Sequence, residues 1–446
     1  MKSIRWRPNA LQTLALGFAL IIVCGALILM LPVSNKGGGT ISFLDALFTA
    51  TSATCVTGLI VFDTYTQFTG FGQLVIILLI QTGGLGFMTV AVMFAMVLKK
   101  RIGLKERSFL MEAVSSLQLG GVVRFARHIL IGTAAIELTG ALLLSIRFVP
   151  QFGWAQGIWF SVFHAISAFC NAGFDLIGVI EPYTSLTPYA ADALVNLVIM
   201  GLIVVGGIGF IVWEDVSSKK FKLREYKLHT KIVLISTVIL TLGSAIAFLL
   251  LEKDGVFAGM GPGERVLAAL FQAVTPRTAG FNTVDTGKLT EASAFLTTLN
   301  MLVGASPGST AGGVKITTVA VLVLAAVNYA RRREDVNLFG RRLEDGVVKR
   351  ACCASTMYLA CALTGSFILM VQQGVSLTDA SFEAFSALGT VGMTRGITRS
   401  LTPISKSAVA LLMYIGRVGS LSVAMAFVER SRAKSLRNPA EKIVIG

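Results

Sequence analysis

Eight apolar runs constrain this chain more than any other feature of its sequence. Most of them exceed the roughly 18 residues that suggest a membrane-spanning helix. They cover residues 11–32, 72–98, 128–149, 193–213, 232–251, 317–328, 355–371 and 407–428. Charged residues make up only 14% of the 446 residues, against roughly 25% in soluble domains. The sequence therefore predicts an all-α polytopic membrane protein.

The basic residues indicate how the chain is oriented in its membrane. Of 39 Lys and Arg residues, 28 fall in five clusters, at 2–7, 99–127, 219–231, 331–350 and 430–442. By the positive-inside rule these clusters are cytoplasmic, which places both termini in the cytoplasm of a multi-pass cell-membrane protein. The first apolar run has no small-residue cleavage site, so we interpret it as an anchor and not a signal peptide. We expect the net charge of +15 to report topology and not nucleic-acid binding.

A short glycine-ended segment occurs four times in the chain. The copies are Phe48–Gly58, Phe163–Gly173, Phe271–Gly280 (one residue shorter) and Phe382–Gly392, and the final glycines are spaced by 115, 107 and 112 residues. Each copy begins with phenylalanine and has a small hydroxyl residue four positions on: Ser52, Ser167, Thr275 and Ser386. So long a period indicates four similar units and not a solenoid.

Each copy ends an apolar segment that is too short to cross a bilayer. Irregular backbone at membrane depth is tolerated only where it lines a cavity or is buried in protein, so such a segment is typical of a re-entrant pore helix. The predicted half-helices are 43–53, 158–169, 266–274 and 381–388. We predict one membrane domain, 1–446, with repeats 11–98, 128–213, 231–328 and 350–428, basic links 99–127, 214–230 and 329–349, and a tail 429–446.

A polar, glycine-rich stretch interrupts the second span of the third repeat. It runs through Gly304, Ala305, Ser306, Pro307, Gly308, Ser309, Thr310, Ala311, Gly312, Gly313, Val314 and Lys315. A helix cannot continue here cheaply, because glycine costs about 1 kcal/mol and proline about 3. Discontinuous membrane helices serve at ion sites and gates, so we expect a gating loop. A kink packed against a neighbouring helix is the alternative.

The four glycine turns can supply oxygen ligands to a dehydrated cation. Glycine reaches positive φ without steric penalty, which lets successive carbonyls point into one channel, as in cation selectivity filters. The candidate ion-binding residues are Cys55, Val56, Thr57 and Gly58; Cys170, Asn171, Ala172 and Gly173; Arg277, Thr278, Ala279 and Gly280; and Thr390, Val391, Gly392 and Met393. We therefore predict eight transmembrane helices and four re-entrant pore helices around one pseudo-four-fold pore.

These turns and the interrupting loop resemble those of the KtrB/TrkH/HKT superfamily of K⁺ transporters, and bacterial KtrB most closely. The resemblance rests on Thr54–Leu59, Asn171–Phe174, Thr275–Phe281, Gly389–Thr394 and the 304–315 loop, and it covers essentially the whole chain. It implies four repeats of span, pore helix and span, and a homodimer with one pore per protomer. It also implies K⁺ as the transported ion, because related transporters with serine at the position of Gly58 pass Na⁺.

The resemblance further implies partners and a gate. A cytosolic KtrA-type nucleotide-binding ring would control the pore, so any ATP or ADP acts through that partner, and Na⁺ is a candidate activator. Arg417 matches the family arginine that restrains the intramembrane loop. We also expect Lys315 to cap or block the loop, Arg277 to brace the filter backbone, and Glu137 to pair with a buried base, Arg417 or Arg277.

Other functions fit the sequence less well. A secondary cation symporter that uses the broken helix as its substrate site should carry inverted repeats and several acidic residues at mid-membrane, but the copies run in one sense and only Glu137 lies mid-span. An intramembrane enzyme would need a nucleophile with a base, or a metal motif, and no HExxH motif occurs. A metal shared by Cys55 and Cys170 competes with simple packing of two small apolar side chains. The sequence favours K⁺ transport.

Overall fold

The protein is mostly helical throughout the part of the chain that the structure describes. The structure is a computed structural model, and it describes residues 10–86, 89, 103, 121–220, 222–333, 335–344, 346–419 and 441. Most of the predicted link 99–127, the end of the first repeat and the chain beyond 419, apart from 441, lie outside the described residues. Within the described ranges, four helices are long and apolar enough to cross a membrane, or five if one bent pair is counted as a span.

The long helices and the short ones alternate along the chain. The helices are α1 (Ala10–Leu29), α2 (Phe43–Thr54), α3 (Thr64–Gln67), α4 (Gly70–Leu85), α7 (Val122–Phe152), α8 (Trp154–Phe169), α9 (Ala193–Gly207), α10 (Phe210–Lys219), α11 (Leu228–Leu251), α12 (Pro262–Val274), α13 (Glu291–Leu302), α14 (Ile316–Ala330), α15 (Val347–Gln373), α16 (Leu377–Gly389) and α17 (Pro403–Val418). Strands β1 (Asn337–Leu338) and β2 (Arg341–Arg342) form an antiparallel hairpin. Short 3₁₀ turns lie at Pro32–Ser34, Ile177–Val179, Thr187–Tyr189, Leu223–Glu225, Thr286–Lys288 and Ile397–Ser400.

The predicted half-helices correspond to α2, α8, α12 and α16, and the last three begin earlier than predicted. Helix α8 begins at Trp154 because Gly153, at φ 81°, separates it from α7. Helix α16 begins at Leu377, where the Ser376 hydroxyl accepts a hydrogen bond from the amide of Asp379. Such N-caps supply a partner to an amide that has none within the helix. Local capping therefore sets these starts, which the hydrophobic pattern alone does not reveal.

The apolar runs 72–98, 193–213 and 407–428 predict unbroken second spans, but in the described residues each of these second helices ends or bends at a glycine inside its run. Helix α4 ends at Leu85, before Gly86 at φ 79°, and α17 ends before Gly419 at φ 95°. Helices α9 and α10 meet at an angle of 96° around Gly209, which has φ 93°. Glycine permits such stops because its positive φ carries no side-chain penalty. In the third unit the stretch between α13 and α14 is not helical, and it contains the predicted loop 304–315.

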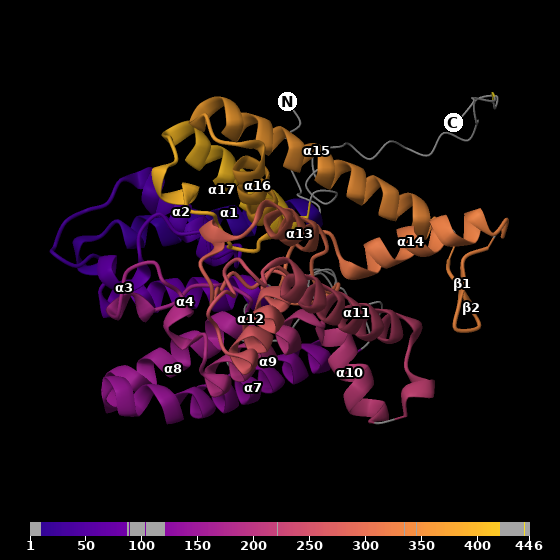
Figure 1. The fold of residues 1–446 in the computed structure, drawn as a ribbon, viewed down its shortest axis with the longest axis horizontal. Coiled ribbons are helices and arrows are strands. Elements are labelled where there is room, and N and C mark those ends of the chain that lie inside the picture. Colours follow the sequence, from indigo (N-terminus) through magenta and orange to yellow (C-terminus); the bar gives the residue numbers. More distant parts are fainter. Residues whose placement is uncertain are drawn as a thin grey trace.

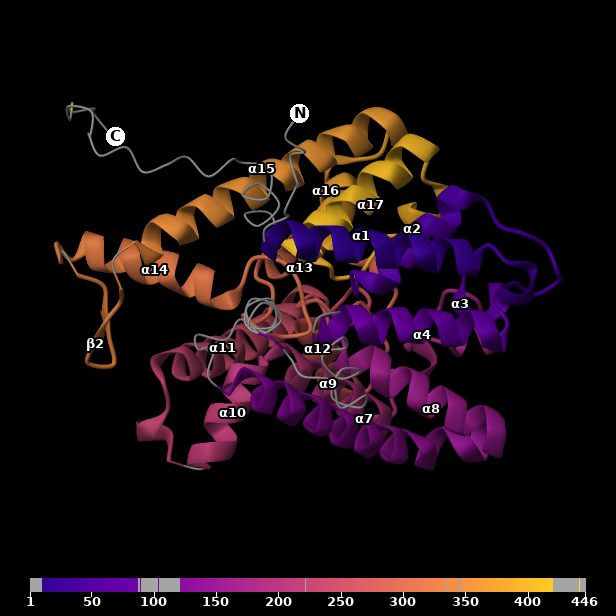
Figure 2. The same ribbon diagram turned by 180° about the vertical axis from the view of Figure 1, so that it is seen from behind.

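The first and last units lie side by side (Figures 1 and 2). Figure 1 shows α15 along one edge of the molecule and α7 along the opposite edge, with α12 and α13 between them. The Tyr414 hydroxyl of α17 donates to the Ala15 carbonyl of α1 at 2.7 Å. The Lys406 ammonium lies 2.6 Å from an Asp45 carboxylate oxygen of α2. The chain thus closes on itself around a common centre.

The phenylalanine that begins each copy of the repeated segment belongs to the core. Phe48, Phe163, Phe271 and Phe382 are among the largest fully buried side chains. Burying such a side chain contributes roughly 1.5–3 kcal/mol relative to leaving it in water. In each copy this anchor lies in the short helix, within its last three turns. The repeated phenylalanines therefore fix the short helices in the interior, next to their glycine turns.

Glycines on the second helices let these helices touch the ends of the short helices. A Cβ atom on Gly83 would overlap the Thr54 carbonyl at the end of α2, and one on Gly206 would overlap the Phe169 carbonyl at the end of α8. A Cβ on Gly416 would likewise overlap the Leu388 carbonyl of α16. The close approach that small residues permit is what allows membrane helices to pack backbone to backbone.

We predict that Gly206→Ala destabilises the protein by about 2–4 kcal/mol, as overpacking against backbone does. Gly201→Ala is the matched control, because it lies in the same helix and a Cβ there meets no atom within 4 Å. The control should be neutral or slightly stabilising, since alanine favours helix over glycine by about 1 kcal/mol. Thermal unfolding in detergent measures both, and equal melting temperatures for the two variants would contradict this packing.

Candidate functional site: a ring of four glycine turns

The four glycine turns share one backbone conformation. The final glycines, Gly58, Gly173, Gly280 and Gly392, have φ values of 96°, 69°, 80° and 91°. The residues two positions earlier, Val56, Asn171, Thr278 and Thr390, also have positive φ, from 52° to 73°. The residue between them is not in that region. Positive φ is a rare and strained conformation for the β-branched residues Val56, Thr278 and Thr390. The alternation of positive and negative φ turns successive carbonyls to one side.

The turns meet one another in a closed cycle. A Cβ atom on Gly58 would lie 2.5 Å from the carbonyl oxygen of Ala172 in the second turn. One on Gly173 would lie 2.7 Å from the Ala279 oxygen of the third turn, and one on Gly280 would lie 2.6 Å from the Val391 oxygen of the fourth.

The fourth turn completes the cycle, because a Cβ on Gly392 would overlap the Thr57 carbonyl of the first turn. Each glycine thus faces a carbonyl oxygen of the next turn. Only a residue without a side chain fits at any of the four places.

The four hydroxyl residues of the repeated segment stabilise these turns. The Ser52 oxygen accepts a hydrogen bond from the Gly58 amide, and the Ser386 oxygen accepts one from the Gly392 amide, both at 3.1 Å. In the other two turns the hydroxyl donates instead: Ser167 to the Phe174 carbonyl at 2.7 Å and Thr275 to the Phe281 carbonyl. The sequence shows this hydroxyl pattern, but its bracing role becomes visible only in three dimensions.

All sixteen predicted filter residues lie in these turns, and all are buried. Of these residues, only the four final glycines line the open space on one side of the ring. A cavity of about 130 Å³ includes Gly58, Gly173, Gly280 and Gly392 in its lining, together with polar residues of the connections that follow the turns. We call this cavity the vestibule.

The vestibule contains charged residues that the sequence did not single out. Asp175, two residues after Gly173, lines it, as do Arg395 and Arg399. Arg395 is paired with Asp379 at 3.1 Å, and the guanidinium of Arg399 lies 3.8 Å from the ring centroid of Tyr183. Its position two residues after the glycine of a turn is the sequence signal that could have identified Asp175.

The interrupting loop of the third unit lies against the second and fourth units. The Thr310 hydroxyl donates to the Phe169 carbonyl at 3.3 Å, and the Gly312 amide donates to the Thr390 hydroxyl at 3.1 Å. At the break between α9 and α10, the Ser306 amide donates to the Gly207 carbonyl at 3.0 Å. Phe169 and Thr390 belong to the ends of pore segments, so the loop lies next to the glycine ring.

Two cations of the predicted gate bind loop carbonyls. Arg417 donates to the Thr310 carbonyl of the loop and to the Gly83 and Gly84 carbonyls at the end of α4, the last at 3.0 Å. The ammonium of Lys315 donates to the Ala311 carbonyl at 2.7 Å and lies 3.4 Å from that of Gly312. Arg417 therefore ties the loop to the first unit, and Lys315 caps carbonyls within the loop.

The prediction that Glu137 pairs with a buried base is wrong for the described residues. Its carboxylate accepts a hydrogen bond from the Gln81 amide at 3.1 Å. The thiol of Cys170, directly behind the second turn, lies 3.4 Å from the Gln81 oxygen. Arg417 is engaged with backbone carbonyls instead. Glu137 thus belongs to a polar cluster behind the second glycine turn.

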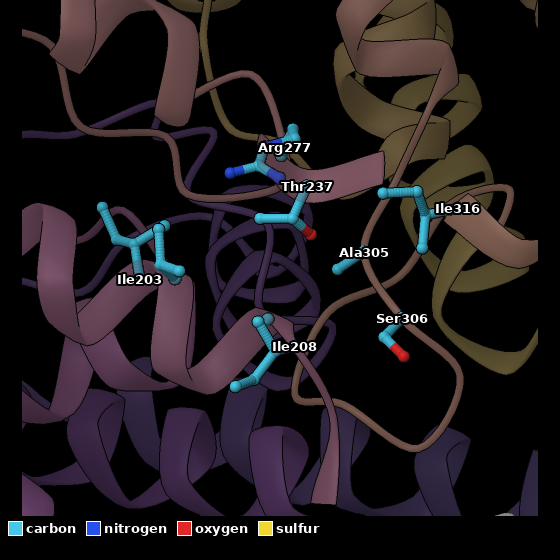
Figure 3. A pocket seen from close by; sticks show the side chains of 9 residues that line it. Ile203, Ile208, Thr237, Arg277, Ala305, Ser306 and Ile316 are labelled. Atoms are coloured by element: carbon cyan, nitrogen blue, oxygen red, sulfur yellow. The ribbon is translucent and has the colours of Figure 1, made fainter. Parts of the chain in front are cut away.

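Arg277 does not brace the filter backbone as predicted. Its side chain is buried and enters a small cavity, of about 20 Å³, between the third turn and the loop (Figure 3). Thr237 of α11 and Ala305 and Ser306 of the loop line the same cavity. Among the described residues its Nε has no hydrogen-bond partner. Arg277 therefore adjoins the loop, and its guanidinium does not reach the filter carbonyls.

Comparison with known proteins places this geometry in a family. A profile of the TrkH family, described as "Cation transport protein", matches residues 27–436. The chain is 42% identical to the Ktr system potassium uptake protein B of Bacillus subtilis, covering 100% of this chain and 99% of that protein. It is 39% identical to the potassium/sodium uptake protein NtpJ of Enterococcus hirae, with the same coverage.

A solved structure shares the fold. The potassium transporter TrkH from Vibrio parahaemolyticus superposes with a TM-score of 0.75 at 17% sequence identity, over 96% of this chain and 86% of that one. The likeness supports a polytopic helical membrane protein.

We predict that Asp175→Asn stabilises the protein more at pH 8 than at pH 5. Burial, and then the nearby Asp63 carboxylate, raise the pKa of Asp175 to about 7. A raised carboxyl pKa means that the folded state holds the proton more tightly than the unfolded chain. Stability is therefore lost as pH rises from about 4 toward 7, and the penalty is complete above that range. The asparagine variant escapes this penalty.

Melting temperatures in detergent across this pH range measure the effect. Asp254→Asn, at an exposed aspartate between α11 and α12, serves as the control. A difference between the Asp175 variant and the wild type that stays constant from pH 5 to pH 8 would contradict the assignment.

Proposed function

Because the chain belongs to the TrkH family of cation transport proteins, we propose that it is the K⁺-conducting membrane subunit of a Ktr-type uptake system. Family membership makes it a transporter and not an enzyme. The choice of K⁺ rests on the names of the relatives from Bacillus subtilis and Vibrio alginolyticus, both potassium uptake proteins. The single observation that carries the mechanism is the cycle of four glycine turns with alternating φ.

In this proposal the four turns form the selectivity filter. Ions pass in single file along backbone carbonyls that replace their hydration shell, and the membrane potential drives them inward. The short helices α2, α8, α12 and α16 end at the turns, so the negative ends of their dipoles, about half a charge each, favour a cation at the centre. The vestibule is the entrance from outside, and the ends that carry the basic links face the cytoplasm.

The loop 304–315 is the proposed gate. It lies against the pore segments of the second and fourth units and is tied to the first by Arg417. These bonds support a position of the loop directly on the cytoplasmic side of the proposed filter. Opening would release the loop from the three neighbouring units, and Arg417 would control that release.

The chain is proposed to act as a homodimer with one pore per protomer, under control of a cytosolic KtrA-type ring that binds ATP or ADP. The basic stretches 99–107, 219–227 and 331–350 would provide the docking surface for that ring. Na⁺ is proposed as an activator of K⁺ uptake; the name of the Enterococcus hirae relative concerns Na⁺ only as an ion taken up by that protein.

K⁺ and Na⁺ fluxes into liposomes that contain the purified chain test the proposed filter. We predict that Gly58→Ser lowers the K⁺/Na⁺ flux ratio about tenfold or more, a change of about 1.4 kcal/mol. Gly58 has a φ of 96° and lies against the Ala172 carbonyl. Both features oppose a side chain at this position, so the turn must move to accept serine. Gly70→Ser, at the start of α4 where a Cβ meets nothing within 4 Å, is the control. An unchanged ratio in the Gly58 variant would argue against the filter.

The gate makes a separate prediction. Replacing 306–312 by a shorter linker should raise K⁺ flux in the absence of any cytosolic partner and make it insensitive to that partner. Arg417→Gln should raise flux in the same direction but less, because only one set of loop contacts is lost. The K⁺/Na⁺ ratio should stay unchanged in both. Flux that remains fully regulated without the loop would exclude it as the gate.

A further inference from the structure

An apolar groove between α11 and α14 is not used by the proposed pore. It consists of two cavities of about 330 and 500 Å³. Ile235, Ile239 and Phe339 line both of them, so the two are continuous. We call this feature the α11–α14 groove. Figure 1 shows the β1–β2 hairpin projecting from the end of α14, and Phe339 is at its tip.

The wall of the groove is apolar and open. Ile239 of α11 is 64% exposed and Val323 of α14 is 57% exposed. Helix α11 is one of the helices long and apolar enough to cross a membrane. These side chains therefore face hydrocarbon, and whatever covers them must itself be apolar.

The charged residues that line the mouth of the groove are all basic. Arg224 and Lys231 line the outer cavity, and none of the residues lining either cavity is Asp or Glu. The Lys231 ammonium donates to the Arg224 carbonyl at 2.9 Å and lies 5.8 Å from the Phe339 ring centroid. A basic mouth over an apolar groove matches an amphiphile with an anionic head, and basic residues beside a membrane helix attract anionic lipids.

The floor of the groove is formed by both ends of the proposed gate. Val303 and Ile316, which flank the 304–315 loop, line the inner cavity. Backbone hydrogen bonds tie these ends together: the Gly304 amide donates to the Val314 carbonyl at 2.8 Å, and the Ile316 amide donates to the Ala305 carbonyl at 3.1 Å. An acyl chain in the groove would touch both ends of the loop.

We propose that the α11–α14 groove binds one anionic phospholipid of the leaflet on the basic side, and that this lipid holds the gating loop in its seat. The phosphate lies at Arg224 and Lys231, and an acyl chain lies against Val303 and Ile316. Because the groove is formed while the loop is seated, the lipid favours that arrangement over one in which the loop ends separate. The regulatory part rests on the proposed gate, but the binding part does not.

A second copy of the chain is the competing occupant, and the charge argues against it. A two-fold contact through this groove would bring the same patch of both copies together. Two mouths that each carry Arg224 and Lys231, without an acid in the lining, would then approach one another. A lipid phosphate neutralises these charges.

Native mass spectrometry of the full chain in detergent tests binding. Dioleoyl-phosphatidylglycerol should bind about tenfold or more tightly than dioleoyl-phosphatidylcholine, as expected for two cations near one headgroup. The double variant Arg224→Gln/Lys231→Gln should lose that preference. Lys222→Gln/Lys227→Gln, which removes equal charge from exposed positions of the same link, should keep it. Equal binding of the two lipids by the wild type overturns the proposal.

Ile239→Trp tests the groove without changing charge. It fills the space for the acyl chain and should also lower phosphatidylglycerol affinity, with an unchanged oligomeric state by size-exclusion chromatography with light scattering. If it breaks a dimer and leaves lipid affinity intact, the groove is a protein interface and the lipid proposal is wrong.

Flux tests the regulatory part. K⁺ uptake should be several-fold slower in vesicles of equal phosphatidylcholine and phosphatidylglycerol than in pure phosphatidylcholine, and the Arg224/Lys231 double variant should show no such difference. Equal rates for the wild type in both vesicles would overturn control of the gate by lipid. If the wild type conducts no K⁺ in either vesicle, the proposed function fails, and the mass spectra still decide whether the groove binds lipid.

Discussion

The contact between each filter glycine and a carbonyl oxygen of the next turn is the constraint on which the rest of the structure depends. A side chain at Gly58, Gly173, Gly280 or Gly392 would meet that oxygen at 2.7 Å or less. Four turns can approach so closely only if the short helices that precede them are held firmly. Buried phenylalanines, hydroxyl braces and glycine contacts with the second helices all serve this purpose. The long helices are the outer frame of a centre made of backbone.

Much of this arrangement could be predicted from the sequence because it is repeated. A fourfold pattern of phenylalanine, hydroxyl residue and glycine is visible along the chain. In the structure the phenylalanines lie in the core, the hydroxyl residues hydrogen-bond to the turns, and the glycines form the ring. The family assignment that the turns suggested is confirmed by full-length relatives. The lengths of the apolar runs were a poorer guide. They suggested continuous second spans, whereas α4, α9 and α17 end at Leu85, Gly207 and Val418, each within two residues of a glycine with positive φ.

Contacts between units could not be read from the sequence, because they depend on which carbonyls are left without partners after the helices break. Arg417 binds the Gly83 and Gly84 carbonyls since α4 ends there. Glu137 needs no cation because Gln81 supplies a donor. Arg277 lines a small cavity together with residues of the loop. In each case a charged residue was correctly singled out, and its partner depended on backbone geometry that hydrophobic pattern does not encode.

The kind of bond that holds the loop is consistent with the reversible gate that we propose. Its contacts with Phe169, Thr390 and Gly207 are single hydrogen bonds, each worth about 0.5–1.5 kcal/mol net. The bond from Arg417 adds about twice that because it is charge-assisted. The sum is therefore of the order of several kcal/mol, and moving a two-state equilibrium from 1:99 to 99:1 takes about 5.5 kcal/mol. A regulatory partner can supply such an energy. A loop buried through large apolar side chains would be too stable to release, which gives a physical reason why glycine, serine, threonine and alanine make up most of its residues.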